Sequence, residues 1–360
     1  MNVDYTDKDT TYMKWMKNRN RRVLILLVLM VCLAGCAGGR AEKETAEQAD
    51  EELIVYCPHP LGLINPIISE FENRTGIDVQ VCSGGTGELL TAIENRAECD
   101  VFWGGSLTSI KPKQELFEPY TSDNEAMIEE EFKNAEGNLT RFTDMPSVLM
   151  VNDNLIEDIP VEGYADLLNP ELKGKIAMCD PASSSSAWEH LINILYAMGD
   201  GEPEAGWSYV QEFADNLDGT LLGSSTAVYQ GVADGRFAVG LTFEEGAVHY
   251  VEDGYPVRIV YMEEGVISRP DVVGIVRGTR HRQQAEQFVD FVTGKDVQTI
   301  VVSDLGRRSV RTDIGGSEYL PDKESIHILF DDLELANQKK QEWLGHFREL
   351  FEKANTEGAE

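Results

Sequence analysis

The chain is short of basic residues and of histidine. Its 360 residues contain 31 Lys and Arg against 63 Asp and Glu, and only six His. The formal net charge of −32 at pH 7 opposes binding to nucleic acid and to anionic lipid surfaces. A small anionic ligand is still compatible with this charge. Backbone N–H groups that converge on one spot attract an anion more strongly than distant acidic side chains repel it, because salt screens charges over about 10 Å.

The sequence also lacks the common patterns of hydrolases. It has no His-Glu-x-x-His segment for zinc and no Gly-x-Ser-x-Gly turn for a nucleophilic serine. None of the six cysteines forms a Cys-x-x-Cys pair, so we expect no zinc site. We therefore expect a protein that is not an enzyme and that carries no metal and no other cofactor.

No apolar run reaches the roughly 20 residues of an ordinary membrane span. The run over residues 23–33 follows a basic cluster and leads into Leu33-Ala34-Gly35-Cys36, an order typical of a secretory signal. We predict a signal peptide over residues 1–35 and a flexible acidic tether over residues 36–51. The signal holds six Lys or Arg and three Asp, or +3, so the exported part carries −32 − 3 = −35. An uncleaved anchor helix is the alternative, and both place the remainder outside the cytoplasm.

Short apolar runs alternate with helix-like segments after the tether. Asn65 and Pro66 predict a helix start, and Gly76 predicts its end. The rhythm of strand, loop and helix predicts an α/β fold of doubly wound sheets, with ligand loops at the carboxyl ends of strands. The length of the chain suits about two domains. Predicted strands cover residues 53–57, 77–81, 100–103, 146–152, 176–179, 237–241, 257–261 and 272–276, and later helices cover 164–175, 188–198, 207–216, 283–292 and 331–353.

Four loops rich in glycine, serine or threonine follow predicted strands or precede predicted helices. They span residues 83–87, 104–106, 183–186 and 224–226. Glycines allow backbone N–H groups to point at one spot, and a helix amino end adds about half a positive charge. Taken together the loops predict an anion cradle, whereas each one alone is equally a tight turn or a flexible loop.

Other polar residues near strand ends are weaker candidates. His59 follows the first strand and suits donation to an anion or a sugar hydroxyl, although a surface histidine is an equal alternative. Glu244 and Glu245 follow the strand at 237–241, where a carboxylate accepts from hydroxyls or an amine and an exposed acidic turn is the alternative. Arg269 is compatible with bidentate binding of an anion, but we favour a surface arginine there.

Two cysteines end the first two predicted strands. If these strands are parallel neighbours, the Cα atoms of Cys57 and Cys82 lie about 5 Å apart, within disulfide range. A Cys57–Cys82 disulfide and two free thiols both remain open. We predict that Cys99 and Cys179 are unpaired.

Several segments together resemble one family. In chain order they are LIVYCPHP, GIDVQVCSGGTGELLTAI, ECDVFWGGS, YADLLNPELKGKIAMCDPASSSSAW, GRFAVGLTFEEGA and LGRRSVR. They are similar to the solute-binding proteins of bacterial ABC transporters, in the ferric-ion-binding-like branch with the type II periplasmic-binding-protein fold. The resemblance implies two lobes joined by a hinge: lobe one of residues 52–145 plus 262–360, and lobe two of residues 146–261.

The resemblance also implies a role for each part of the chain. A Cys after Leu-Ala-Gly resembles a lipoprotein signal, which implies a lipid on Cys36 that anchors the protein to the membrane. The partner is an ABC permease, and we expect a monomer. Ligand-binding residues carried over by position are His59, Ser83, Gly85, Thr86, Gly105 and Ser106 from lobe one, with Ser184, Ser185, Ser186, Thr226, Thr242 and Glu244 from lobe two.

The ligand is the open part of this interpretation. Ferric-ion binders of the family use two adjacent tyrosines, and no Tyr-Tyr pair occurs in this chain. Relatives that bind sugar phosphates or phosphonates rely on hydroxyls and backbone donors, which suits the four loops. We therefore favour an organic phosphate, sugar phosphate or phosphonate. A ferric-ion receptor, or a ligand-sensing partner of a membrane kinase, is the alternative.

Overall fold

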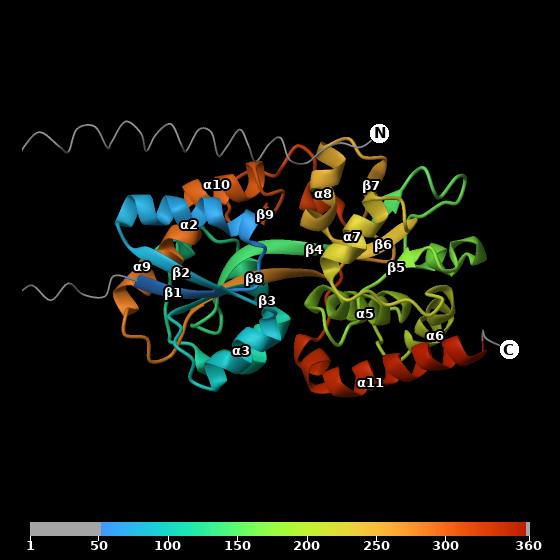
Figure 1. The fold of residues 1–360 in the computed structure, drawn as a ribbon, viewed down its shortest axis with the longest axis horizontal. Coiled ribbons are helices and arrows are strands. Elements are labelled where there is room, and N and C mark those ends of the chain that lie inside the picture. The colour runs from blue at the N-terminus through green and yellow to red at the C-terminus, as the bar shows by residue number, and fades with distance from the viewer. Residues whose placement is uncertain (1–51, 358–360) are drawn as a thin grey trace, which may run out of the picture. The chain divides into compact units, whose positions relative to one another are not determined.

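Strands and helices alternate through the computed structural model, which describes residues 52–357 (Figure 1). The predicted signal, the tether and Cys36 lie outside the described residues. No helix among residues 52–357 is long and apolar enough to cross a bilayer. The strands are β1 (Glu52–Cys57), β2 (Asp78–Ser83), β3 (Val101–Ser106), β4 (Thr140–Asn152), β5 (Ile176–Ala177), β6 (Val239–Phe243), β7 (Val257–Val260), β8 (Ser268–Ile275) and β9 (Arg308–Ser309).

Helices fill most of the intervals between these strands, as the alternating pattern predicted. They are α2 (Leu61–Thr75), α3 (Thr86–Glu94), α4 (Leu107–Ile110), α5 (Ser185–Met198), α6 (Trp207–Asn216), α7 (Ser225–Ala233), α8 (Glu244–Glu252), α9 (Arg282–Val292), α10 (Lys295–Ser303) and α11 (Leu333–Glu357). The segment over residues 164–175 forms only the short 3₁₀ turns Ala165–Leu168 and Pro170–Leu172.

The strands join in the order β2-β1-β3-β8-β4-β6-β5, and β7 and β9 both pair with β4. Strand β1 is parallel to β2 and β3, and β5 is parallel to β6. Strands β4 and β8 run antiparallel to each other in the middle of this path. The sheet is therefore continuous, with a parallel group at each end and two long strands between them (Figure 1).

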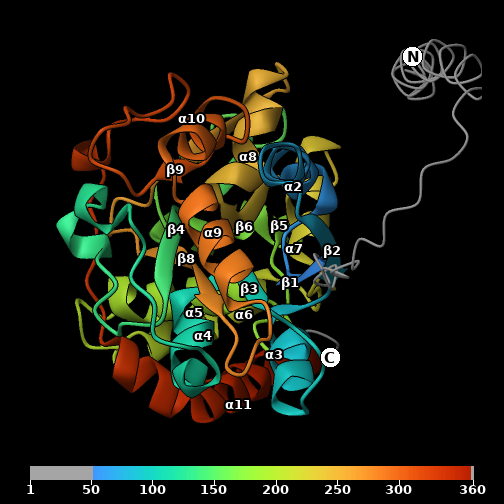
Figure 2. The same cartoon turned by 90° about the vertical axis from the view of Figure 1, so that its left-hand side faces the viewer.

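Two main hydrophobic cores define the two lobes of this α/β fold. The core of lobe one packs β1 and β3 against α2 and α9, around Phe71, Trp103 and Phe288. Figure 2, viewed from the side of lobe one, shows α9 in front of these strands. The core of lobe two packs β6 against α5 and α6, around Trp188 and Phe213. Because β4 contributes residues to both cores, it is a covalent connection between the lobes.

The predicted residue boundaries of the lobes remain a prediction, but one placement differs. The resemblance implied that the C-terminal helix belongs to lobe one, whereas α11 lies along α5 and α6 (Figure 1). Its Trp343 contacts Trp188 with ring centroids 6.2 Å apart, and Phe347 joins the same core. The apolar stripe of α11 is thus buried against lobe two, to which it returns after β9.

Helix α2 begins five residues earlier than predicted. It starts at Leu61, so Pro66 lies inside the helix rather than at its first position. An interior proline costs about 3 kcal/mol because it removes one backbone hydrogen bond. Burial of Leu63 and Ile64, at roughly 1.5–3 kcal/mol each, offsets that cost. The end of the helix is as predicted, because Gly76 adopts the left-handed conformation with φ 75°.

Cys57 and Cys82 are free thiols, so the disulfide that the sequence analysis left open does not form. The parallel register pairs Tyr56 with Cys82 and Cys57 with Ser83. This offset of one residue turns the two thiols to opposite faces of the sheet. Cys57 is buried in the lobe-one core, and Cys82 packs against the cluster on the other face. Cys99 and Cys179 are also free.

We therefore expect Cys57 and Cys82 to be reduced in the purified protein. Alkylation in denaturant without a reductant should label both residues, as read by peptide mass spectrometry. Prior reduction is the control and should leave the labelling pattern unchanged. A peptide pair linked through Cys57 and Cys82 would contradict the register.

Candidate functional site

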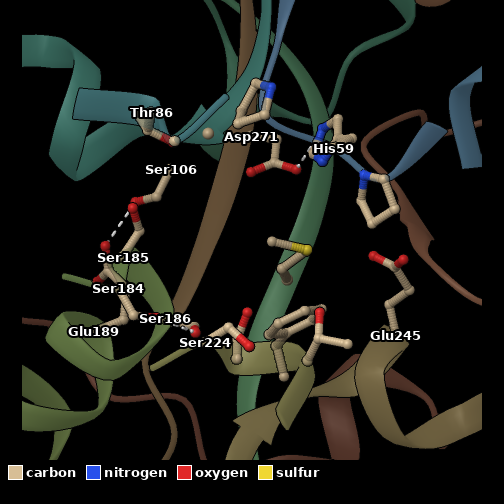
Figure 3. Close-up of a pocket in the computed structure, with 18 of the residues that line it drawn as sticks. His59, Thr86, Ser106, Ser184, Ser185, Ser186, Glu189, Ser224, Glu245 and Asp271 are labelled. Carbon is tan, nitrogen blue, oxygen red and sulfur yellow. Dashed lines mark hydrogen bonds and ion pairs between the residues drawn. The ribbon is translucent and has the colours of Figure 1, made fainter. Parts of the chain in front are cut away.

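A cavity of about 320 Å³ lies between the two lobes and is lined by groups from both. Lobe one contributes the turn after β1, the start of α3 and the end of β3. Lobe two contributes the starts of α5, α7 and α8. Figure 3 shows the side chains that surround it. The cavity thus occupies the carboxyl ends of strands, where α/β folds bind ligands.

Three helices that begin at this cavity, α3, α5 and α7, have nine or more residues and a glycine or serine as the N-cap residue. The N-cap residues Gly85 of α3, Ser184 of α5 and Ser224 of α7 all line it. The Ser184 and Ser224 hydroxyls accept from the N–H groups of Ala187 at 3.4 Å and Ala227 at 3.2 Å. The first N–H groups of a helix have no intrahelical acceptor, and the helix dipole places partial positive charge there. The cavity is therefore electropositive on these sides without a lysine.

Most of the sequence-predicted ligand residues lie together here. The structure brings His59, Gly85, Thr86, Gly105, Ser106, Ser184, Ser185, Ser186 and Thr226 into the lining of one cavity. Ser106 also reaches across it, since its hydroxyl donates to Oε1 of Glu189 at 2.6 Å (Figure 3). Loops as far apart in the sequence as Thr86 and Thr226 therefore meet, as the pattern of strand ends predicted.

Three predicted residues do not line the cavity. Ser83 ends the edge strand β2 and is exposed to solvent. Thr242 is buried within β6, where its backbone C=O accepts from His190. Glu244 accepts from Arg308 at 2.8 Å and from the hydroxyl of Tyr261 at 2.6 Å. Consecutive residues at the start of α8 point in different directions, so Glu245 lines the cavity instead.

The charged groups at the back of the cavity were not predicted from the sequence. Arg307 and Asp271 had no local signal, because they become neighbours of His59 only through the fold. Arg307 does lie within the LGRRSVR segment, which was the available clue. Glu189 sits inside a helix that looked purely structural. Arg269 is not a surface residue: its side chain is 15% exposed and lines the cavity.

Arg307 is the centre of a buried ion cluster. Its Nε donates to Glu245 at 2.7 Å, and Nη1 donates to Asp271 at 2.7 Å and Thr143 at 3.2 Å. Its Nη2 faces Nδ1 of His59 at 3.3 Å and also pairs with Glu245. A guanidinium has five N–H groups, so each one already has a partner in the protein. Arg307 therefore joins the lobes and has no donor left for a ligand.

His59 is a neutral ring in this cluster. Burial and the Arg307 charge hold the pKa of His59 well below its ordinary value. Because Arg307 only donates, Nδ1 accepts and the ring proton is on Nε2. That Nε2 lies 3.3 Å from Oδ2 of Asp271 but makes no hydrogen bond. Burial raises the pKa of Asp271, an effect that Arg307 opposes.

Arg269 holds a second ion cluster at the opposite wall. Its Nε donates to the hydroxyl of Thr108 at 3.0 Å and lies 3.4 Å from Oε2 of Glu189. Its Nη2 pairs with Asp331, in the segment that leads into α11. Like Arg307, this arginine is compensated by protein carboxylates. Across residues 52–357, no group of three or more His, Cys, Asp or Glu side chains is placed to hold a metal ion.

His190 lies directly behind the cavity on α5 and is fully buried. Its Nε2 is 2.6 Å from the C=O of Thr242, and its Nδ1 is 2.9 Å from the hydroxyl of Tyr164. The C=O only accepts, so Nε2 carries the proton and the tyrosine donates to Nδ1. Burial lowers the pKa of His190 from 6.5 to about 4.

The comparisons with known proteins agree with this geometry. Residues 53–304 match the family described as bacterial extracellular solute-binding protein, and the chain belongs to that family. A probable ABC transporter periplasmic-binding protein of Sinorhizobium fredii is 26% identical over 267 residues, 71% of this chain and 74% of the relative. The Fe(3+)-binding periplasmic protein of Serratia marcescens is 24% identical over 275 residues, 71% of this chain and 78% of the relative.

Solved structures give the same fold. The periplasmic binding protein AfuA of Actinobacillus pleuropneumoniae, with fructose-6-phosphate bound, aligns with a TM-score of 0.74 and 23% identity, over 84% of this chain and 98% of that one. A protein described as a two-component system protein that mediates signal transduction aligns with a TM-score of 0.70 and 28% identity, over 81% and 99%. This chain is an extracytoplasmic solute-binding protein.

We expect the free energy of unfolding to decrease as the pH falls, because His190 then becomes protonated. Because the pKa of His190 is lower in the folded protein than in the unfolded chain, folding favours the neutral ring. This stabilisation is complete above about pH 6.5 and is lost as the pH falls toward 4. Between about pH 6.5 and 4.5 the loss is about 2 kcal/mol.

Urea unfolding at several pH values measures this loss. In His190→Gln, the loss of unfolding free energy between about pH 6.5 and 4.5 should be smaller by about 2 kcal/mol, because glutamine does not titrate. His327→Gln, at an exposed position, is the control and should keep the parental slope. Equal slopes for all three proteins would show that His190 is not responsible.

Removal of Arg307 should be strongly destabilising. Arg307→Met leaves Asp271 buried without its cation, which costs about 3–5 kcal/mol. Arg236→Met is the matched control, because Arg236 is exposed and its pair with Asp234 is 3.8 Å long. We expect the control to change the unfolding free energy by about 0.5 kcal/mol or less. Similar effects in both variants would contradict the central role of Arg307.

Proposed function

We propose that the solute is a small organic anion with a phosphate or phosphonate group. Its phosphorus end binds at the amino ends of α3, α5 and α7. The observation that carries this proposal is the convergence of three helix amino ends and their hydroxyl side chains on one cavity between the lobes. N–H and O–H donors match the oxygen acceptors of a phosphate, and the dipoles favour its charge.

The ferric-ion alternative fits this cavity less well. A hard cation needs anionic oxygen ligands. The carboxylates that line the cavity, Glu189, Glu245 and Asp271, are each already paired with Arg269 or Arg307. AfuA, whose structure contains fructose-6-phosphate, supports the phosphate proposal by analogy of fold.

A sensing role is a second candidate for the same ligand. Its support is the 28% identity to the protein described as mediating signal transduction in a two-component system. Capture of a ligand by two hinged lobes serves import and sensing equally, so the binding chemistry proposed above holds for both. We further propose that the protein is a monomer and that a lipid on Cys36 anchors it outside the cell.

Titration calorimetry with matched ligands tests the proposed function. Glucose 6-phosphate or an aminoalkylphosphonate should bind, and glucose and ethylamine, which lack the phosphorus group, should not. A visible charge-transfer band on addition of ferric citrate, without binding of any phosphorus ligand, would overturn the proposal.

Substitutions at the cavity test where the phosphorus group of the ligand binds. Thr86→Ala and Ser185→Ala each remove one donor from the cavity and should weaken binding by about 1–3 kcal/mol. Ser83→Ala is the matched control, because Ser83 is exposed and outside the cavity, and it should bind like the parent. Unchanged affinity in both cavity variants would rule out the cradle.

A further inference from the structure

The C-terminal helix α11 contacts both lobes. Most of it lies along α5 and α6, and Ala336, Trp343 and Phe347 are buried in the core of lobe two. Its first residue, Leu333, packs instead against the apolar cluster of lobe one that α3, β3 and α4 form. In Figure 1 the red helix begins beside α3 and continues beneath α5 and α6. The start of α11 therefore bridges the two lobes.

Lobe two holds Leu333 in place from both sides. Before it, the N–H group of Leu329 donates to the C=O of Val266 at 2.9 Å, and Val266 belongs to the core of lobe two. The N–H group of Asp332 donates to the hydroxyl of Tyr196 on α5 at 3.1 Å. After it, the buried stripe of α11 packs into the same core. Leu333 is thus fixed to lobe two and loses its contact with lobe one when the lobes separate.

An ion pair lies directly beside this apolar contact. Asp331 is anchored with the same segment, and its buried carboxylate pairs with Nη2 of Arg269. The Nε of Arg269 donates to the hydroxyl of Thr108 in α4 at 3.0 Å and lies 3.4 Å from Oε2 of Glu189. Glu189 in turn accepts from Ser106 across the cavity at 2.6 Å. The start of α11 therefore adjoins a contact that crosses the cavity, on the side where the lobes separate.

From these contacts we infer that the start of α11 is a latch, which holds the two lobes closed when no solute is bound. The apolar contact of Leu333 and the ion pair of Asp331 each join a segment anchored in lobe two to lobe one. Both contacts stabilise the closed form before a solute adds its own differential affinity for that form. The latch does not depend on the nature of the solute, so it goes beyond the proposed function and is tested without a ligand.

The labelling rate of a thiol inside the cavity measures the open fraction. Ser147 of β4 lines the cavity and is 5% exposed, so a bulky maleimide reaches the thiol of Ser147→Cys only when the lobes open. When opening and closing are fast, the labelling rate is proportional to the population of the open form. Peptide mass spectrometry separates this thiol from the native cysteines. Cys57, which is buried in the core of lobe one, reports global unfolding in the same sample.

In the Ser147→Cys background, Leu333→Ala should increase the labelling rate of the introduced thiol. We expect about a 10-fold increase, or about 1.4 kcal/mol in the closed–open equilibrium, for the loss of part of the burial of a leucine. Asp331→Asn removes the ion pair and should increase the rate as well. In all of these proteins the introduced thiol should react faster than Cys57, because its exposure comes from opening and not from unfolding.

Leu344→Ala is the matched control. Leu344 is partly buried on the same helix, but it packs against the core of lobe two. Its truncation destabilises the open and the closed form equally, so it should leave the labelling rate of the introduced thiol unchanged. Labelling of Cys57 should increase instead, because the unfolded chain becomes more populated.

Three results would overturn the latch. One is an introduced thiol that reacts in the background protein as fast as in urea, which would mean that the free protein is open. Another is an equal rate in the background, in Leu333→Ala and in Asp331→Asn. The third is an equal increase in Leu333→Ala and Leu344→Ala, which would mean that loss of stability alone exposes the cavity. Should Leu333→Ala not fold, the background rate and Asp331→Asn decide.

Discussion

The buried guanidinium of Arg307 is the interaction on which the site depends. It contacts His59 and Asp271 in lobe one and Glu245 in lobe two. One side chain therefore fixes the positions of the two cavity walls relative to each other. Its neighbour Arg308 repeats the arrangement with Glu244, where two adjacent arginines meet two adjacent glutamates. A buried arginine needs this many acceptors, because an unpaired charge in a protein interior is far more costly than a missing contact. The same requirement removes Arg307 from direct ligand binding.

The proposed binding of an anion by a chain with net charge −32 requires a local source of attraction. Both arginines at the cavity are paired with protein carboxylates, so side-chain cations do not attract the proposed anion. Backbone dipoles are the source of this attraction, because helix amino ends carry partial positive charge whatever the net charge of the protein. Such dipoles act over a few ångströms only, which makes them selective for a group that enters the cavity.

Much of the fold and part of the site were predictable from the sequence. Apolar runs such as residues 53–57 gave strands, and the Ser183–Ser186 and Ser224–Thr226 loops lie at helix starts, because these signals are local in the chain. Arg307 and Asp271 were missed, because a buried ion pair is defined by a contact between distant segments and leaves no local pattern. The state of Cys57 and Cys82 was left open for a related reason. Neighbouring strands were foreseen, but the one-residue offset in their register was not.

The contacts across the cavity also constrain how a ligand acts. Ser106 bonds to Glu189, and Arg307 bonds to Glu245, so protein groups alone already hold the two lobes together on both sides of the cavity. A ligand shifts the equilibrium between open and closed forms only by its differential affinity for them. Groups from one lobe are available in both forms and contribute little to that difference. The effective contacts are those made at once to Thr86 in lobe one and to Ser185 or Thr226 in lobe two, because only the closed form presents them together. Closure by the proposed phosphorus group would therefore follow from where the helix amino ends converge.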